Sequence, residues 1–301
     1  MSDTSLHTPE TLRSRSEAAA SALPALLADA EHLANVVLLG DHGRKRYGTG
    51  DEFWQYRPAE AGDSYRAIDW RRSARADGHF VRQTEWQAAQ AVMLGVDDAA
   101  SMTFTGSAKG RDARPSKLRR AQTLAMATAI LAIRGGERVG LSHLAEPPRA
   151  GQAQLLSLAS ALMDHEDRPD YGAPKPQIMP EGCQAVFFSD FLGDPTAIET
   201  VMSQAADRGV KGALIQILDP DEEAFPYDGR TVFESMSGAV RFETLKARSL
   251  REAYLDRLAE RKDRLKSKAR RTGWRYYLHH TNKPADPALL WLYQSLERRR
   301  R

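Results

Sequence analysis

Gln184-Ala185-Val186-Phe187-Phe188-Ser189, followed by Asp190, is the stretch of sequence that decides the fold. Its four consecutive apolar residues leave no polar face, so the segment predicts a β-strand buried on both sides. Similar strands are predicted at Ala91–Val96 and Lys211–Leu218, and each of the three is followed directly by an aspartate. Strands of this kind are typical of a parallel sheet that is covered by helices. The three aspartates are Asp97, Asp190 and Asp219.

Helical patterns separate these strands. Ser116–Ile133 carries apolar residues at helical spacing, follows Pro115, and ends at Gly135-Gly136. Further helices are predicted at Gln152–Met163, Asp194–Arg208, Leu245–Arg271 and Pro287–Leu296, further strands at Phe80–Gln87, Arg138–Leu144 and Trp274–His279, and a hairpin at Val232–Glu243. The alternation predicts a doubly wound, mostly parallel α/β sheet. Such sheets bind their ligands at the carboxyl ends of the strands, where the three aspartates fall.

The N-terminal part has a different composition. Residues 1–15 are polar and are expected to form a disordered tail. Residues 16–37 are rich in Ala, Leu and Glu and predict an amphipathic helix, whereas residues 40–82 mix glycine, arginine, aspartate and aromatic residues, which favours loops and short strands. We therefore expect an N-terminal helix with a small irregular Gly/Arg-rich β subdomain over residues 16–87, and the α/β domain over residues 88–301.

Composition excludes several classes of protein. The chain has 301 residues, of which 42% are hydrophobic and 28% are charged, as in ordinary soluble globular proteins. Cys183 is the only cysteine, which excludes a disulfide framework and a cysteine-rich zinc module. No apolar run approaches the roughly 18–20 residues that cross a bilayer, and the N-terminus lacks a signal-peptide pattern. These observations favour the cytoplasm.

Two motifs carry a resemblance to a known family. The first is Gly48-Thr49-Gly50-Asp51-Glu52-Phe53, followed by Gly62-Asp63-Ser64-Tyr65-Arg66-Ala67-Ile68-Asp69-Trp70 and then Ala74-Arg75, and the second is Val96–Met102. Together they resemble the family called domain of unknown function 58. The resemblance implies a von Willebrand factor A-like (Rossmann-like) domain. It also implies association with a MoxR-type AAA+ ATPase, a pair thought to assist the assembly or maturation of client proteins.

The same resemblance implies a site for Mg²⁺ or Mn²⁺ at the top of the sheet. The matching ligands are Asp97, Ser101 and Asp190, which carry the oxygen donors that these cations prefer. The pattern is degenerate, because Ala99 replaces one oxygen ligand and the expected threonine has no counterpart between Leu141 and Thr196. The alternative is structural: Asp97 and Ser101 cap the loop that follows the strand.

The Gly/Arg-rich motif has nearly balanced charge. Residues 41–86 hold 9 basic and 8 acidic residues, which is unsuited to binding phosphate. We expect Arg66, Arg71 and Arg75 to pair with Glu52, Asp63 or Asp69, with Trp70 as the apolar anchor. The alternative is that this surface docks the ATPase. The candidate residues, structural or partner-docking, are Glu52, Phe53, Arg57, Gly62, Asp63, Arg66, Asp69, Trp70, Arg71 and Arg75.

Charge is distributed unevenly along the chain. Glu146–Glu234 holds 16 acidic and 6 basic residues, whereas Arg241–Arg301 holds 7 acidic and 18 basic residues. The basic C-terminal helix could be solvated, could dock an acidic protein, or could bind nucleic acid; the last ranks third because no aromatic residues interleave its basic residues. No nucleophile, base and oxyanion donor can be assembled from the sequence, so a metal-dependent hydrolase ranks last. The leading expectation is a non-enzymatic adaptor or chaperone-like protein with a MoxR-type AAA+ ATPase and an unknown client as partners.

Overall fold

The computed structural model describes residues 23–37, 53–60, 64–65, 68–75, 78–84, 90–107, 113–164, 169–172, 179–235, 238 and 241–296. The predicted tail at residues 1–15 lies outside these ranges. The chain divides into two compact units, of which the smaller spans His42–Ala89 and the larger holds the rest. Among the helices of the described ranges, none is both long and apolar enough to cross a membrane.

The larger unit is built on a five-stranded sheet. Its strands are β3 (Ala91–Val96), β4 (Arg138–Leu141), β5 (Gln184–Ser189), β6 (Lys211–Leu218) and β9 (Arg275–His280). Their order is β4-β3-β5-β6-β9, and every neighbouring pair is parallel. The chain moves outward from β3 to β4 and then returns across β3 to β5. This reversal is the switch point at which doubly wound sheets bind ligands.

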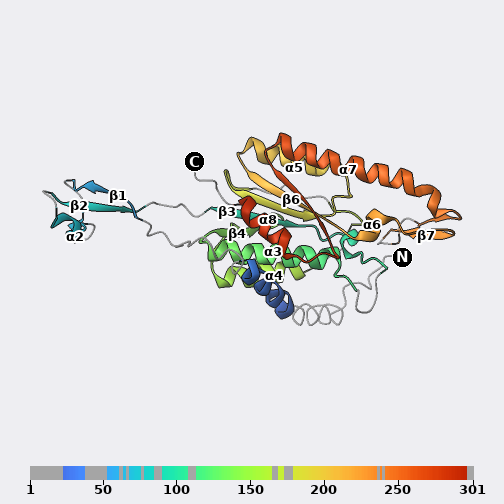
Figure 1. The fold of residues 1–301 in the computed structure, drawn as a ribbon, viewed down its shortest axis with the longest axis horizontal. Coiled ribbons are helices and arrows are strands. Elements are labelled where there is room, and N and C mark those ends of the chain that lie inside the picture. Colours follow the sequence, from blue (N-terminus) through green and yellow to red (C-terminus); the bar gives the residue numbers. More distant parts are fainter. Residues whose placement is uncertain are drawn as a thin grey trace, which may run out of the picture. The chain divides into compact units, whose positions relative to one another are not determined.

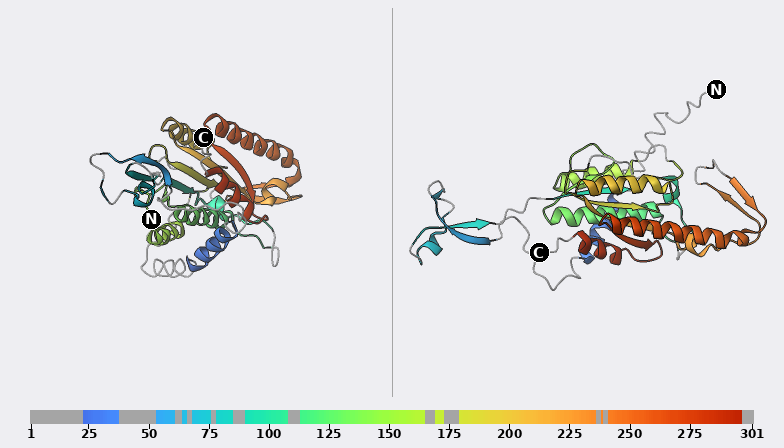
Figure 2. Two further views of the ribbon diagram at one scale, coloured as in Figure 1. Left: turned by 60° about the vertical axis from the view of Figure 1, so that its left-hand side comes forward. Right: turned by 90° about the horizontal axis from the view of Figure 1, so that it is seen from above.

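Helices cover both faces of the sheet (Figures 1 and 2). One face carries α3 (Lys117–Arg134), α4 (Gln152–Met163), α8 (Asp286–Leu296) and the helix of residues 23–37. The other face carries α5 (Pro195–Asp207) and α7 (Arg251–Arg271). The predicted α/β architecture, a mostly parallel sheet flanked by helices, is confirmed.

Alternate side chains of the central strands enter two separate cores. On β5, Val186 and Phe188 belong to the core beneath α3, whereas Ala185 and Phe187 belong to the core beneath α5 and α7. The two-residue period of a strand sends neighbouring side chains to opposite faces, so a continuous apolar run fills both cores. This pattern explains why the strand at residues 184–189 was evident from the sequence.

The N-terminal helix belongs to the larger unit. We predicted that it would form one region with the Gly/Arg-rich subdomain, but its apolar face packs in the same core as α3. Leu26, Ala30 and Ala34 are fully buried there, at intervals of four residues. The grouping differs from the expectation because an amphipathic helix is positioned by the apolar face that it buries, and not by its neighbours in sequence.

Short elements complete the larger unit. They are η2 (Ala100–Thr103), α6 (Pro220–Ala224), the hairpin of β7 (Thr231–Glu234) with β8 (Arg241–Thr244), and η4 (Ala247–Leu250). The long basic helix that we predicted over Leu245–Arg271 begins later, at Arg251. The residues just before it form the separate 3₁₀ turn η4.

The smaller unit contains an antiparallel pair, β1 (Phe53–Pro58) with β2 (Phe80–Thr84), and the one-turn helix α2 (Trp70–Ser73). Asp69 begins α2: its carboxylate accepts the backbone N–H of Arg72 at 3.0 Å and the hydroxyl of Tyr56 at 3.0 Å. Trp70, the expected apolar anchor, is 53% exposed, and its ring meets His79 at 70°, with the ring centroids 5.4 Å apart. Val81 on β2 is buried, and the role of Trp70 as an anchor stays a prediction.

The other candidates in the Gly/Arg-rich motif are described only in part. Arg71 and Arg75 are exposed. The backbones of Phe53 and Arg57 lie in β1. Glu52, Gly62, Asp63 and Arg66 fall outside the described residues, so the ion pairs predicted for them stay predictions.

Candidate functional site

The three aspartates predicted at strand ends lie at one edge of the sheet. Asp97 follows β3, Asp190 follows β5, and Asp219 follows β6, and these strands are neighbours. Asp190 and Asp219 are fully buried. Charged groups removed from water need partners, so the contacts of these carboxylates determine what the edge can do.

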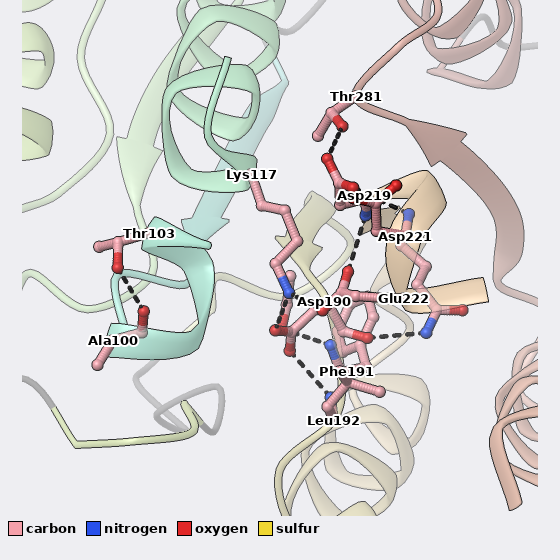
Figure 3. A network of polar contacts seen from close by, with 12 residues as sticks. Ala100, Thr103, Lys117, Asp190, Phe191, Leu192, Asp219, Asp221, Glu222 and Thr281 are labelled. Carbon is pink, nitrogen blue, oxygen red and sulfur yellow. Dashed lines mark hydrogen bonds and ion pairs between the residues drawn. The ribbon is translucent and has the colours of Figure 1, made fainter. Parts of the chain in front are cut away.

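A lysine that the sequence did not single out supplies the central positive charge. Lys117 is the first residue of α3, and its side chain is fully buried. Its Nζ lies 2.8 Å from Oδ2 of Asp190 and 2.5 Å from Oε1 of Glu222 (Figure 3). Burial alone would lower the pKa of Lys117, but the two carboxylates outweigh it and hold the pKa above its ordinary value. Lys117 is therefore a charged counter-ion, and its protonated amine is neither a base nor a nucleophile.

Asp219 organises the turn after β6. Its Oδ1 accepts the backbone N–H of Asp221 at 3.0 Å, and the Glu222 carboxylate reaches back to the Asp219 N–H at 2.7 Å. This reciprocal capping box begins α6 and aims Glu222 at Lys117. The other Asp219 oxygen accepts the hydroxyl of Thr281 at 2.7 Å, and Arg114 lies 3.2 Å from Oδ1.

Asp97 caps the loop that follows β3, as the structural alternative predicted. Its Oδ1 accepts the backbone N–H of Ala99 at 2.9 Å, and its Oδ2 accepts the hydroxyl of Ser189 at 2.5 Å. The backbone of Gly172 passes so close that a Cβ there would stand 1.9 Å from Oδ1 of Asp97. Burial raises the pKa of Asp97 to about 6, and the charges of Asp190 and Asp98 add to the rise.

Ser101 does not share this capping role. Its backbone N–H donates to the carbonyl of Asp170 at 2.8 Å, which holds the loop of η2 against residues 169–172. Its hydroxyl is buried, and no described residue offers it a hydrogen-bond partner. The structure therefore brings Asp97 and Asp190 to adjacent strand ends, linked through Ser189, and leaves Ser101 beside them.

The raised pKa of Asp97 predicts a pH dependence of stability. The pKa of Asp97 is about 6 in the folded chain and 3.8 in the unfolded chain, so the protonated carboxyl group is favoured by folding. Its contribution to stability is fully present below pH 3.8 and is lost as the pH rises through 6. The loss amounts to about 3 kcal/mol. Compared with Asp97→Asn, the wild-type chain should thus lose about 3 kcal/mol of unfolding free energy between about pH 4 and pH 7.5. Urea unfolding measures this difference, and parallel pH profiles for the two proteins would contradict it.

The donor set does not fit the divalent cation that the resemblance implies. Both oxygens of Asp97 accept hydrogen bonds from this chain, and Asp190 Oδ2 is paired with an ammonium. Ala99 contributes no side-chain oxygen. In the part of the chain that the structure describes, no group of three or more His, Cys, Asp or Glu residues could hold a metal ion. The predicted ligands are thus near one another but are committed to other partners.

Two residues of this cluster carried a signal in the sequence that we did not use. Lys117 stands in the first turn of a helix, where a positive charge opposes the helix dipole, so its presence there indicates a specific partner. Glu222 stands three residues after Asp219, which is the spacing of a capping box. Neither signal identifies the partner of the lysine, because that contact is tertiary.

These features define an α/β protein with a doubly wound parallel sheet and a buried ionic cluster at its switch point. Residues 55–264 match the family described as "Protein of unknown function DUF58", and the chain belongs to that family. The resemblance found from the sequence motifs is thereby confirmed.

Mycobacterial proteins are similar in sequence to most of the chain. "Uncharacterized protein Mb1516" of Mycobacterium bovis and "Uncharacterized protein Rv1480" of Mycobacterium tuberculosis are each 29% identical over 238 residues, covering 74% of this chain and 72% of theirs.

Two solved structures from Bacteroides are weakly similar. The conserved hypothetical protein BatB of Bacteroides thetaiotaomicron gives a TM-score of 0.39 at 14% identity, covering 68% of this chain and 98% of that one. An aerotolerance-related membrane protein of Bacteroides fragilis gives 0.38 at 15% identity, covering 69% and 98%. No conclusion about this chain rests on scores this low.

Proposed function

We propose that the protein is a non-enzymatic, cytoplasmic adaptor with a von Willebrand factor A-like domain. It couples a MoxR-type AAA+ ATPase to the assembly or maturation of a client protein, and it binds through the carboxyl edge of the sheet. The single observation that carries the proposal is the position of this edge at the switch point, in a member of this family.

The exposed residues around the edge would make the contact, because the buried cluster beneath them is committed to internal partners. Asp98 is exposed beside Asp97, and Asp194 is exposed at the start of α5. Tyr171 is 52% exposed, and its pKa is raised by partial burial and by the nearby Asp190 charge. An aromatic side chain bordered by carboxylates suits a partner that offers apolar and basic groups.

The double variant Asp98→Lys/Tyr171→Ala should weaken binding to the purified ATPase at least about tenfold, because it removes an aromatic side chain and reverses a charge. Glu181→Lys is the matched control: Glu181 is exposed just before β5, at the opposite edge of the sheet. The ATPase is first identified by mass spectrometry after capture with tagged protein, and affinities are then measured by calorimetry. Equal affinity of the double variant and the wild type would reject this edge as the binding surface.

A second candidate function, nucleic-acid binding, is favoured by one observation. A depression of about 420 Å³ lies between the end of α7, β9 and α8. It is lined by three cationic residues, Lys266, Arg270 and Arg275, and three aromatic residues, Trp274, Tyr276 and Trp291. Tertiary structure thus gathers the aromatic groups whose absence from the basic helix argued against this function. Trp274 is buried and stacks on Phe187, so the partly exposed rings of Tyr276 and Trp291 are the ones that could stack on the bases of a single-stranded nucleic acid.

Binding of a fluorescent single-stranded oligonucleotide tests this candidate. Lys266→Ala/Arg270→Ala should weaken binding and reduce the slope of log K against log salt by roughly one unit for each phosphate that the variant no longer neutralises. Arg257→Ala is the control, because Arg257 is exposed on the same helix outside the depression. No binding by the wild type at low salt would eliminate the candidate.

A further inference from the structure

We propose that the Lys117 ammonium is a built-in cation that takes the place of a divalent metal, so that the carboxyl edge of the sheet works without one. One consequence, that partner binding needs no metal on this chain, rests on the proposed function. The metal-binding behaviour of the isolated protein, which is the direct content of the inference, is independent of any partner.

The carboxylate oxygens around Lys117 already accept hydrogen bonds within this chain. Asp190 accepts the Leu192 N–H at Oδ1, at 3.0 Å, and the Lys117 ammonium at Oδ2, at 2.8 Å. Glu222 accepts Lys117 at Oε1, at 2.5 Å, and the Asp219 N–H at Oε2, at 2.7 Å. Each of these oxygens therefore already shares its negative charge with a donor, and a metal would have to compete with that donor.

Asp97 is used in the same way. Its two oxygens accept the Ala99 N–H and the Ser189 hydroxyl. Among the predicted ligands, the Ser101 hydroxyl alone lacks a partner within the described residues. One neutral hydroxyl cannot hold Mg²⁺, which is usually bound through at least one carboxylate.

The Lys117 ammonium lies between two carboxylates, in the position that a bound cation would take. It enters from the start of α3, next to the strand ends at the switch point (Figure 3). Two sides of its ammonium face Asp190 and Glu222, and a third faces the ring of Phe104, with Nζ 5.7 Å from the ring centroid. Carboxylates and an aromatic face both stabilise a positive charge. The negative charges of Asp190 and Glu222 therefore have a positive partner without a metal.

Electrostatic repulsion also opposes a metal at this position. A divalent cation on Asp190 would stand within a few ångströms of the Lys117 ammonium, in a buried region where charges repel strongly. Metal and ammonium thus exclude each other. Removing the ammonium should free Oδ2 of Asp190 and Oε1 of Glu222, and carboxylate oxygens of this kind are ligands for Mn²⁺ and Mg²⁺.

The experiment measures Mn²⁺ binding by calorimetry and by thermal unfolding, on full-length protein freed of metal with EDTA. The wild type should show no binding heat and no change in Tm. Lys117→Ala should gain a Mn²⁺-dependent rise in Tm of about 5 °C. Adding Asp190→Asn to Lys117→Ala should abolish the gain. Lys211→Ala is the matched control, because Lys211 is exposed at the start of β6 and should behave as the wild type.

Two results would overturn the inference. One is Mn²⁺ binding by the wild type that Asp97→Asn or Asp190→Asn abolishes. The other is a folded Lys117→Ala that Mn²⁺ does not stabilise. If Lys117→Ala does not fold, Lys117→Gln, which keeps hydrogen-bond donors toward the carboxylates, is measured in its place. Because these readings use the isolated chain, they stay separate from the ATPase-binding test of Asp98→Lys/Tyr171→Ala.

Discussion

Lys117→Met should lower the free energy of unfolding by about 3–5 kcal/mol, because it leaves the buried Asp190 carboxylate without its counter-ion. Methionine has nearly the length of the lysine side chain and fills much of the same space, so the loss reports charge rather than a cavity. Urea unfolding at neutral pH measures it. Lys211→Met, at an exposed position, should change stability by less than about 0.5 kcal/mol.

A double variant separates the ion pair from general damage. Lys117→Met/Asp190→Asn removes both charges and keeps an amide oxygen for the Leu192 N–H. It should be more stable than Lys117→Met alone by about 1–2 kcal/mol, since the two residues are in direct contact. The single variants Lys117→Met and Asp190→Asn are measured as well. If the loss in the double variant equals the sum of the two single losses, the pair is not coupled and the proposed counter-ion role is contradicted.

Phe188→Ala should cost about 3–5 kcal/mol, the usual range for deleting a buried aromatic side chain. Phe188 is fully buried on β5, in the core beneath α3. Its backbone carbonyl accepts the N–H of Asp97 at 2.9 Å, and alanine keeps this bond, so the loss reports the deleted side chain. Urea unfolding gives the free energy.

Phe242→Ala is the matched control for that prediction. Phe242 lies on β8 and is 54% exposed, so the same substitution should change stability by less than about 0.5 kcal/mol. Equal losses at the two positions would contradict the assignment of Phe188 to the main core.

The main elements of the fold could be predicted because their signals are local. The strands at residues 91–96, 184–189 and 211–218 and the helix at residues 152–163 have the bounds that we expected. Apolar runs and helical spacing record which faces are buried, and that information lies within a few residues. The role of Trp70 has no such local signal, because whether a tryptophan is an anchor depends on residues that are distant in the sequence.

The candidate site could be predicted only in its position. Asp97 and Asp190 were placed correctly at strand ends, because parallel strands carry their carboxyl ends to one edge. Their partners could not be assigned. The depression near Trp291 illustrates the same limit, since its aromatic groups come from the residue before β9, from β9 itself and from α8, while two of its basic groups come from α7.

The sequence by itself determined a parallel α/β sheet with acidic residues at its carboxyl edge, because strand burial and chain alternation are written in short-range periodicity. Only the tertiary structure decided what neutralises those acids. Lys117 meets Asp190 across 73 residues of sequence and Glu222 across 105. A counter-ion chosen over such separations follows from how α3 packs on the sheet, and no local pattern encodes it.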